Sequence, residues 1–255
     1  MGAHADTVAV VTGGSQGLGL AIAEELAREG CTRLLLAGRD RAKGEAAAAA
    51  LGAAFAAADM ADPAQAAGLI DEAARRWGRV TALVNAAAAT DRASILDCTP
   101  AEWDRQMAVN ARGPFFALQR LAQAAVAGGH PAACVNILSM VVHCGQSFLA
   151  PYSASKAALA NVTRNAAQAL RRHRVRVNGI ACGWMDTPGE DAIQRRWHGA
   201  GDGWLAKAEA AAPMGMLVKP AHVAGLASYL LSDRSGVMTG SVVDFDQHVA
   251  GAYPE

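Results

Sequence analysis

Short apolar segments alternate with helical segments along almost the whole chain. In the first such pair, the segment TVAVVTGG precedes Leu18, Ile22 and Leu26, which recur at helical spacing. Strands that are apolar at successive positions are typical of parallel sheets buried on both faces. Right-handed helical crossovers join such strands. The sequence therefore predicts an α/β fold with a doubly wound parallel sheet and helices on both of its faces.

The expected elements follow one another without a break until residue 183. Strands are expected within 7–14, 32–39, 53–59, 80–85, 132–139, 175–182 and 240–245, and helices within 18–30, 41–51, 63–77, 100–128, 152–173 and 221–231. The chain has 255 residues and no Pro/Gly-rich linker, so we expect one domain over 1–255. The segment 184–213 interrupts the alternation. Long interruptions at the end of a strand often cover a ligand, so we predict a substrate lid there.

The composition argues against several classes of function. The net charge is +0 and there is no Lys/Arg run, so nucleic acid is not an expected partner. The longest apolar run, 46–58, is too short to span a membrane, and the N-terminus lacks a signal-peptide pattern. Five scattered cysteines indicate free thiols in a reducing compartment, and we expect a cytoplasmic protein. The seven histidines have no ligand spacing, so no metal site is predicted.

A glycine-rich segment, VTGGSQGLG, follows the first expected strand and opens the first expected helix. Gly13, Gly17 and Gly19 would let the backbone turn tightly and approach a pyrophosphate. The helix N-terminus would add unpaired N–H groups and a partial positive charge. Glycines that only pack a strand against a helix are the alternative. The position after the first strand favours a dinucleotide site in a Rossmann-type fold.

The end of the second expected strand, LLLAGRD, bears on the choice of dinucleotide. An acidic residue there would hold the ribose 2′-hydroxyl of NAD, whereas an arginine suits the 2′-phosphate of NADP. Gly38 stands where the acid would be, and Arg39 follows it. Asp40 comes one position later and keeps NAD as the alternative, and Gln16 gives the glycine loop no basic residue. The sequence favours NADP.

With these features, further segments resemble the short-chain dehydrogenase/reductase family over nearly the whole chain. They are TGGSQGLG (12–19), ADMAD (58–62), LVN (83–85), VNARGPF (109–115), Ser139, YSASK (152–156), RVN (176–178) and MTG (238–240). The resemblance implies an NAD(P)-dependent oxidoreductase that transfers a hydride between nicotinamide and a secondary alcohol or ketone. It also implies a homotetramer or dimer built partly on the helices that begin near Pro100 and Tyr152.

The resemblance implies four catalytic residues. Tyr152 would be the acid/base that exchanges a proton with the substrate oxygen, and Lys156, four positions later on the same helix face, would favour its phenolate. Ser139 would donate a hydrogen bond to the substrate oxygen. Asn110 would bind a water that links Lys156 to solvent. A tyrosine and a lysine on a solvated helix face are the alternative for the pair taken alone.

The resemblance also implies a set of cofactor contacts. They are Gly13, Ser15, Gln16, Gly17, Leu18, Gly19, Arg39, Asp59, Met60, Asn85, Tyr152, Lys156, Gly183, Met185 and Thr187. The chain departs from the family pattern at Ala86 and Ala88 in the fourth-strand motif, at Cys182 in place of proline, and at Met216 in place of arginine. These departures put the subfamily, the substrate and the assembly in doubt, but they leave the four catalytic positions intact.

Three side chains are expected to face the substrate: His143, Gln146 and Trp184. Polar groups beside a tryptophan would suit a sugar or polyol, with reduction of a ketone, a steroid or a 3-oxoacyl substrate as the alternative. A non-catalytic dinucleotide-binding protein on the same fold is a hypothesis of a different class. The presence of Ser139, Tyr152 and Lys156 argues against it.

Overall fold

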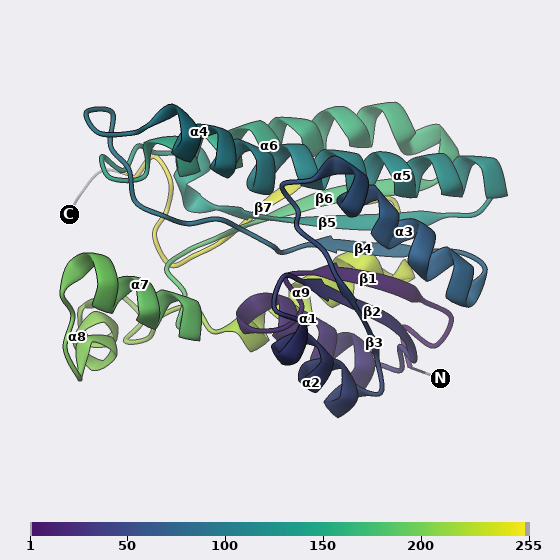
Figure 1. Ribbon diagram of the computed structural model, residues 1–255, viewed down its shortest axis with the longest axis horizontal. Helices are drawn as coiled ribbons and strands as arrows, with labels where there is room; N and C mark the ends of the chain where they lie inside the picture. The colour runs from purple at the N-terminus through teal and green to yellow at the C-terminus, as the bar shows by residue number, and fades with distance from the viewer. Residues whose placement is uncertain (1, 253–255) are drawn as a thin grey trace.

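A twisted parallel sheet forms the centre of the protein (Figure 1). The computed structural model describes residues 2–252. Within them the sheet has seven strands in the order β3-β2-β1-β4-β5-β6-β7. The strands are β1 (Val8–Thr12), β2 (Arg33–Gly38), β3 (Ala54–Ala57), β4 (Ala82–Asn85), β5 (Ala132–Ser139), β6 (Val175–Cys182) and β7 (Val242–Phe245). All lie within the expected ranges, and the doubly wound α/β architecture is confirmed.

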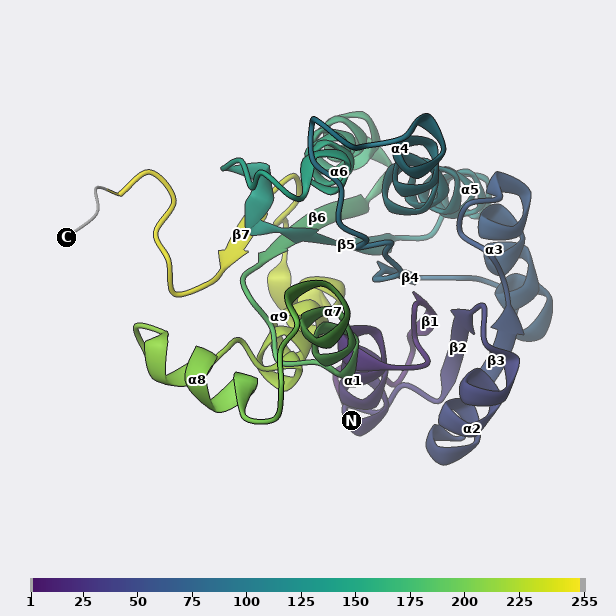
Figure 2. The same cartoon turned by 60° about the vertical axis from the view of Figure 1, so that its left-hand side comes forward.

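Helices cover both faces of the sheet (Figure 2). One group comprises α3 (Pro63–Trp77), α4 (Pro100–Met107), α5 (Gly113–Gly128) and α6 (Ala150–Leu170). The other comprises α1 (Gly17–Arg28), α2 (Arg41–Leu51) and α9 (Pro220–Leu231). Two further helices, α7 (Pro188–His198) and α8 (Trp204–Ala211), lie beyond the end of the sheet (Figure 1). No helix among residues 2–252 is long and apolar enough to cross a bilayer.

The core consists of two main apolar layers, because successive strand residues point to opposite faces. Val10 of β1 packs in one layer with Leu121 of α5, and its neighbour Val11 packs in the other with Ile22 of α1. All four side chains are fully buried. Burial of both faces explains why the strand segments are apolar at nearly every position.

The long helix expected over 100–128 is interrupted. Residues Ala108–Arg112 form a π-helical turn between α4 and α5. The insertion of such a turn rotates the residues that follow, and π-turns are frequent at functional sites. Gly113 then begins α5 so close to the chain after β3 that a Cβ atom would lie 2.0 Å from the Met60 carbonyl oxygen. Only glycine fits at this crossing.

The segment expected to be a lid contains α7 and α8. Its two ends are joined: Val218 N donates to Trp184 O at 3.0 Å, and Asp186 N donates to Val218 O at 3.0 Å. Lys219 bonds Asp186 and Glu209, so a side-chain ion pair reinforces the same closure. The segment is therefore a closed excursion of the chain after β6, and its role as a lid stays a prediction.

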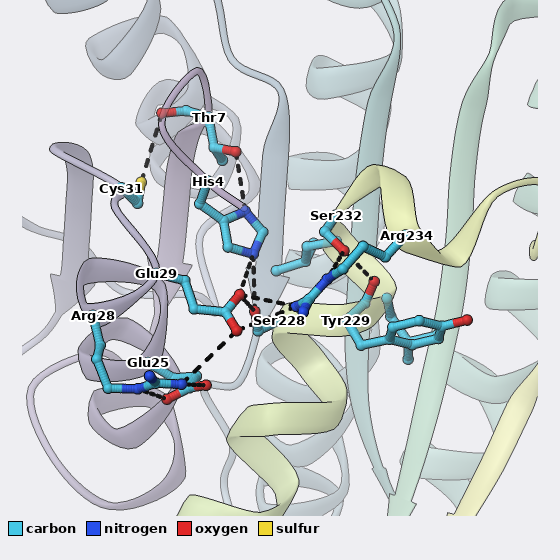
Figure 3. A network of polar contacts seen from close by, with 12 residues as sticks. His4, Thr7, Glu25, Arg28, Glu29, Cys31, Ser228, Tyr229, Ser232 and Arg234 are labelled. Carbon is cyan, nitrogen blue, oxygen red and sulfur yellow. Dashed lines mark hydrogen bonds and ion pairs between the residues drawn. The ribbon is translucent and has the colours of Figure 1, made fainter. Parts of the chain in front are cut away.

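A buried polar network anchors the N-terminal residues (Figure 3). The ring of His4 is fully buried, with Nδ1 3.0 Å from Thr7 Oγ1 and Nε2 2.9 Å from Ser228 Oγ. Ser228 donates to Glu29 Oε2 at 2.6 Å, and Glu29 pairs with Arg234. Burial lowers the pKa of His4, which favours the neutral ring. The network ties the start of β1 to the end of α1 and to α9, at the end of β1 away from the glycine loop.

Candidate functional site

A large cavity lies at the carboxyl ends of the parallel strands. Its volume is about 1520 Å³, and its lining runs from the glycine loop after β1 to the ends of β5 and β6 and the start of α7. The sheet order reverses between β1 and β4, so the loops after these two strands diverge and leave a crevice. The cavity exceeds the usual size of a small-molecule pocket, roughly 300–1,000 Å³. It has room for a dinucleotide and a second ligand.

The glycine loop forms one wall of this cavity. Gly13 and Gly17 adopt left-handed conformations, with φ of +67° and +56°. A Cβ atom on Gly19 would lie 2.3 Å from the Gly13 carbonyl oxygen, so a side chain is excluded there. Ser15, Gln16 and the first residues of α1 also line the cavity. This cradle at a helix N-terminus fits the pyrophosphate of a dinucleotide.

Two cations line the cavity beyond the end of β2. Arg39 and Lys43 have no ion pair among residues 2–252, and Lys43 Nζ lies 3.5 Å from Gln16 Oε1. Asp40 is occupied differently: it caps α2 by accepting a hydrogen bond from Lys43 N at 3.0 Å. Lys43 was not expected from the sequence. Its position in the first turn of a helix that starts beside Arg39 is the signal that could have identified it.

The residues expected at the adenosine side separate into two groups. Asp59 and Met60 line the cavity, and Asp59 Oδ1 accepts a hydrogen bond from Ala61 N at 2.9 Å. Asn85 is buried and absent from the cavity lining. Its amide donates to Asn136 Oδ1 at 2.8 Å, and Asn136 donates to Thr163 of α6 at 2.9 Å. Asn85 therefore braces β4 against β5 and α6.

Ser139 and Tyr152 meet at the other end of the cavity. Ser139 is the last residue of β5 and Tyr152 lies in the first turn of α6, and both line the cavity. Burial raises the pKa of Tyr152 to about 12, and the nearby side chain of Ser139 opposes this effect. In the unliganded protein, desolvation thus outweighs the influences expected to favour a phenolate.

Lys156 lies one helical turn beyond Tyr152, behind the cavity wall. Its side chain is 2% exposed, its Nζ donates to the Ile137 carbonyl at 2.7 Å, and it lies 5.7 Å from the centre of the Tyr152 ring. Burial lowers the pKa of Lys156 to about 8. The lysine is therefore protonated below this pH and loses its charge above it.

Asn110 lies in the π-helical turn and organises the loop that follows β4. Its Oδ1 accepts a hydrogen bond from Ala89 N at 2.7 Å. Its Nδ2 donates to Ala89 O at 2.8 Å and to Ser155 Oγ at 3.0 Å. The two amide donors are thus used by protein acceptors. This geometry makes Asn110 a positioning residue for the loop, and a water link from it to Lys156 stays a prediction.

The residues expected at the substrate line the cavity beside Ser139. His143 Nε2 lies 2.8 Å from Asp244 Oδ1, and Trp184 Nε1 donates to Glu190 Oε1 at 2.8 Å. Gln146 lines the same region. The contribution of Asp244 from β7 was not expected, because only the folded sheet brings residue 244 beside residue 143.

The remaining expected contacts follow β6. Gly183 and Met185 line the cavity, and Thr187 caps α7 by accepting a hydrogen bond from Glu190 N at 3.0 Å. A Cβ atom on Gly183 would lie 2.0 Å from Asp246 Oδ1, which excludes a side chain.

The departures from the family pattern leave this wall intact. Ala86 N and Ala87 N both donate to Thr12 Oγ1, so the loop after β4 stays tied to β1 without the second asparagine. Ala88 lines the cavity, and burial raises the pKa of Cys182 to about 12, which keeps its thiol protonated and unreactive. Met216 is 37% exposed and is not among the residues that line the cavity.

We predict that Lys156→Met stabilises the unliganded protein at pH 7 by about 2 kcal/mol. Removing a buried charge whose pKa has fallen from 10.5 to about 8 gains about 3 kcal/mol, and losing its hydrogen bond to Ile137 O costs about 1 kcal/mol. Below pH 8 the lysine is charged in both the folded and unfolded states, so the cost of burying it is fully present. That cost disappears as the pH rises from about 8 to 10.5, and the advantage of the variant should disappear with it. Urea denaturation against pH measures the difference, with the exposed Lys207→Met as the control. A variant less stable than the wild type at pH 7 would contradict the prediction.

The comparisons with known proteins agree with this geometry. Residues 13–247 match a family model described as Enoyl-(Acyl carrier protein) reductase. The chain is 32% identical to the Galactitol 2-dehydrogenase of Agrobacterium fabrum, over 94% of this chain and 95% of that protein. It is 34% identical to the NADP-dependent (R)-specific alcohol dehydrogenase of Lentilactobacillus kefiri, over 93% and 94% of the two chains. A solved structure of a short chain dehydrogenase/reductase family protein matches with a TM-score of 0.81 and 33% identity, over 94% and 95% of the two chains.

A shared fold alone would leave function open, but these matches span nearly the whole chain at substantial identity. The protein is an NAD(P)-dependent oxidoreductase of secondary alcohols or the corresponding ketones. The chain belongs to the short-chain dehydrogenase/reductase family.

Proposed function

We propose that the protein oxidises a secondary hydroxyl of a sugar or polyol, or reduces the corresponding ketone, with Ser139, Tyr152 and Lys156 as its catalytic residues. The observation that carries this proposal is the position of Ser139 and Tyr152 at one end of a cavity whose other end is the glycine loop. A ligand that spans the cavity would place its nicotinamide beside these two side chains.

The chemistry follows from the side chains themselves. When bound, a nicotinamide dinucleotide supplies or accepts the hydride. Ser139 orients the substrate oxygen by hydrogen bonding, and Tyr152 exchanges a proton with that oxygen. A phenol with a pKa of about 12 is a poor base at neutral pH. The ammonium of Lys156, which is charged below about pH 8, favours the phenolate when the site operates.

The polar surroundings support a hydroxylated substrate. His143 is held by Asp244 and Trp184 by Glu190, and Gln146 lines the same region. His143 and Gln146 can hydrogen-bond hydroxyl groups, whereas Trp184, whose single N–H is taken by Glu190, can offer its ring face. The similarity to a galactitol dehydrogenase supports the same substrate class.

We predict that Tyr152→Phe lowers kcat by about 100-fold or more, because general acid–base groups contribute roughly 10²–10⁴-fold. The matched control is Tyr229→Phe, which removes the hydroxyl of a partly exposed tyrosine on α9. Reduced-nicotinamide absorbance with a panel of sugars, polyols and ketones measures both. Equal turnover by wild type and Tyr152→Phe would exclude the assigned mechanism.

We propose NADP as the preferred cofactor. Arg39 and Lys43 line the cavity beyond β2, and neither has an ion pair among residues 2–252. Asp40, the residue that kept NAD as an alternative, is occupied as the cap of α2. Two such cations, beside a carboxylate that already accepts a backbone N–H, suit a ribose 2′-phosphate.

Arg39→Asp should therefore reverse the cofactor preference, lowering kcat/KM for NADP by about 10-fold or more through loss of a charge-assisted contact. The control is Arg41→Asp, because Arg41 pairs with Glu45 and is absent from the cavity lining. The ratio of kcat/KM for the two cofactors is the measurement. An unchanged ratio in Arg39→Asp would refute the NADP preference.

We propose further that the protein is a cytoplasmic homo-oligomer. Trp103 and Phe115, on α4 and α5, are 43% and 41% exposed, and Phe115 borders a shallow groove with Met107 and Val162. Large apolar side chains gathered on one face are typical of an interface. Light scattering should give a molar mass that is a multiple of 26.2 kDa, and Phe115→Glu should lower this mass. A monomeric wild type would exclude the assembly.

The proposed location is the cytoplasm. The five cysteines are free thiols, which suits a reducing compartment. Cell fractionation would test the location.

A further inference from the structure

Arg92 stands in the loop after β4 and lines the catalytic end of the cavity. Two backbone bonds hold this loop against the segment before α6: Ala93 N donates to Phe148 O at 3.1 Å, and Ala150 N donates to Ala93 O at 3.0 Å. At its other end, the loop is held by the amide of Asn110 through Ala89. Arg92 is therefore carried by a loop that is fixed on both sides.

The guanidinium of Arg92 is oriented but incompletely bonded. Its Nη1 donates to Thr90 O at 3.1 Å, and its Cζ lies 5.4 Å from the centre of the Phe148 ring. Its Nε is buried and has no hydrogen-bond partner among residues 2–252, and Arg92 forms no ion pair with them. A buried N–H without an acceptor is unfavourable, so its presence calls for an explanation.

The other charged groups at the catalytic end of the cavity have partners within the protein. Arg105 also lines it, but this arginine pairs with Asp91 and Glu102. Glu190 accepts hydrogen bonds from Trp184 and Gln194. The last carboxylate at this end, Asp246, accepts from Gln247 N and lies near His248. Arg92 thus forms no ion pair with these carboxylates, and its charge acts to lower the pKa of Tyr152 while the Glu190 carboxylate acts to raise it.

We propose that Arg92 binds a carboxylate of the substrate, so that the enzyme acts on hydroxy acids and the corresponding oxo acids. This inference rests on the proposed function, because it names the substrate class of the same site. A single planar guanidinium matches one carboxylate in a two-point contact, whereas a phosphate dianion would call for more than one cation. The Phe148 ring lies 5.4 Å from Cζ, and the Thr90 carbonyl occupies Nη1, which leaves Nη2 to meet the carboxylate, together with Nε once the side chain turns toward the cavity.

The proposed reaction is balanced by groups already named. The carbinol carbon of the hydroxy acid loses its hydrogen as a hydride to the oxidised nicotinamide. The hydroxyl proton leaves through Tyr152, and a C=O bond replaces the C–OH bond. The carboxylate on Arg92 is unchanged, so Arg92 determines specificity and takes no part in proton or hydride transfer.

The test compares acids with neutral alcohols of the same carbon skeleton. The pairs are gluconate with glucitol, galactonate with galactitol, and 3-hydroxybutyrate with 1,3-butanediol, each with NADP and with NAD. In the wild type, kcat/KM for at least one acid should exceed that for its neutral partner by about 10-fold or more, the value of a charged hydrogen bond. Isothermal titration of the same acids into the protein saturated with the reduced dinucleotide, which cannot accept a hydride, measures binding without turnover.

Variants then assign the effect to the side chain. Arg92→Met should lower kcat/KM for that acid by about 10- to 100-fold, mainly through KM, and should affect the neutral partner far less. Arg92→Lys, which keeps the charge without the planar fork, should recover part of the loss. The control is Arg196→Met, because Arg196 is 69% exposed and absent from the cavity lining.

Each outcome separates the inference from the function on which it rests. A wild type that oxidises the neutral alcohols but neither binds nor oxidises the acids overturns the inference and leaves the proposed function standing. Equal losses for acid and neutral alcohol in Arg92→Met overturn the inference as well. A wild type that uses no member of any pair overturns both. Because the wild-type comparison needs no variant, it tests the inference even if Arg92→Met folds poorly.

Discussion

The pairing of β1 with β4 is the constraint on which the site depends. Thr12 lies in register with Asn85 at the carboxyl ends of these strands. The crossovers from the two strands run in opposite directions, which opens the crevice between their loops. The hydroxyl of Thr12 closes the junction: it donates to Val84 O at 3.3 Å and accepts from the backbone N–H groups of Ala86 and Ala87. One side chain thus sets the distance between the glycine loop and the loop that carries Arg92.

Buried polar groups position the catalytic end, at some expense in stability. Lys156 is among the largest fully buried side chains, and the surrounding protein lowers its pKa to about 8. Polar contacts run from Asn110 to Ser155 and from Asn136 to Thr163, so α6 is fastened to the π-turn and to β5 on either side of the lysine. Satisfied networks of this kind rigidify a core, whereas a single missing partner makes them costly. The Tyr152–Lys156 face of α6 is held in place by these contacts.

Local pattern predicted the elements but not the contacts between them. The predicted range of α3 agrees with the structure residue for residue, because Asp62 and Pro63 favour a helix start and Gly78 favours a helix end. The π-turn at 108–112 was missed, since a one-residue insertion leaves the helical periodicity nearly unchanged. Of the site, the glycine loop and the Ser139, Tyr152 and Lys156 positions could be found by motif. Lys43 is indicated only by its place in the helical turn after Arg39. Asp244 and Arg92 could not be found by motif, because the packing of distant segments brings Asp244 to His143 and Arg92 to the catalytic end of the cavity.

The carboxylates that line the cavity share a feature that the net charge of the chain does not indicate. The chain as a whole has a net charge of +0, yet every carboxylate that lines the cavity accepts a hydrogen bond from the protein: Asp40, Asp59, Glu190 and Asp246. Of the three arginines that line the cavity, Arg39 and Arg92 lack an ion pair among residues 2–252, and they stand after β2 and β4 at its two ends. Low-dielectric walls strengthen the field of such charges. Ligands with a negative charge at each end of the cavity would pair with these two arginines.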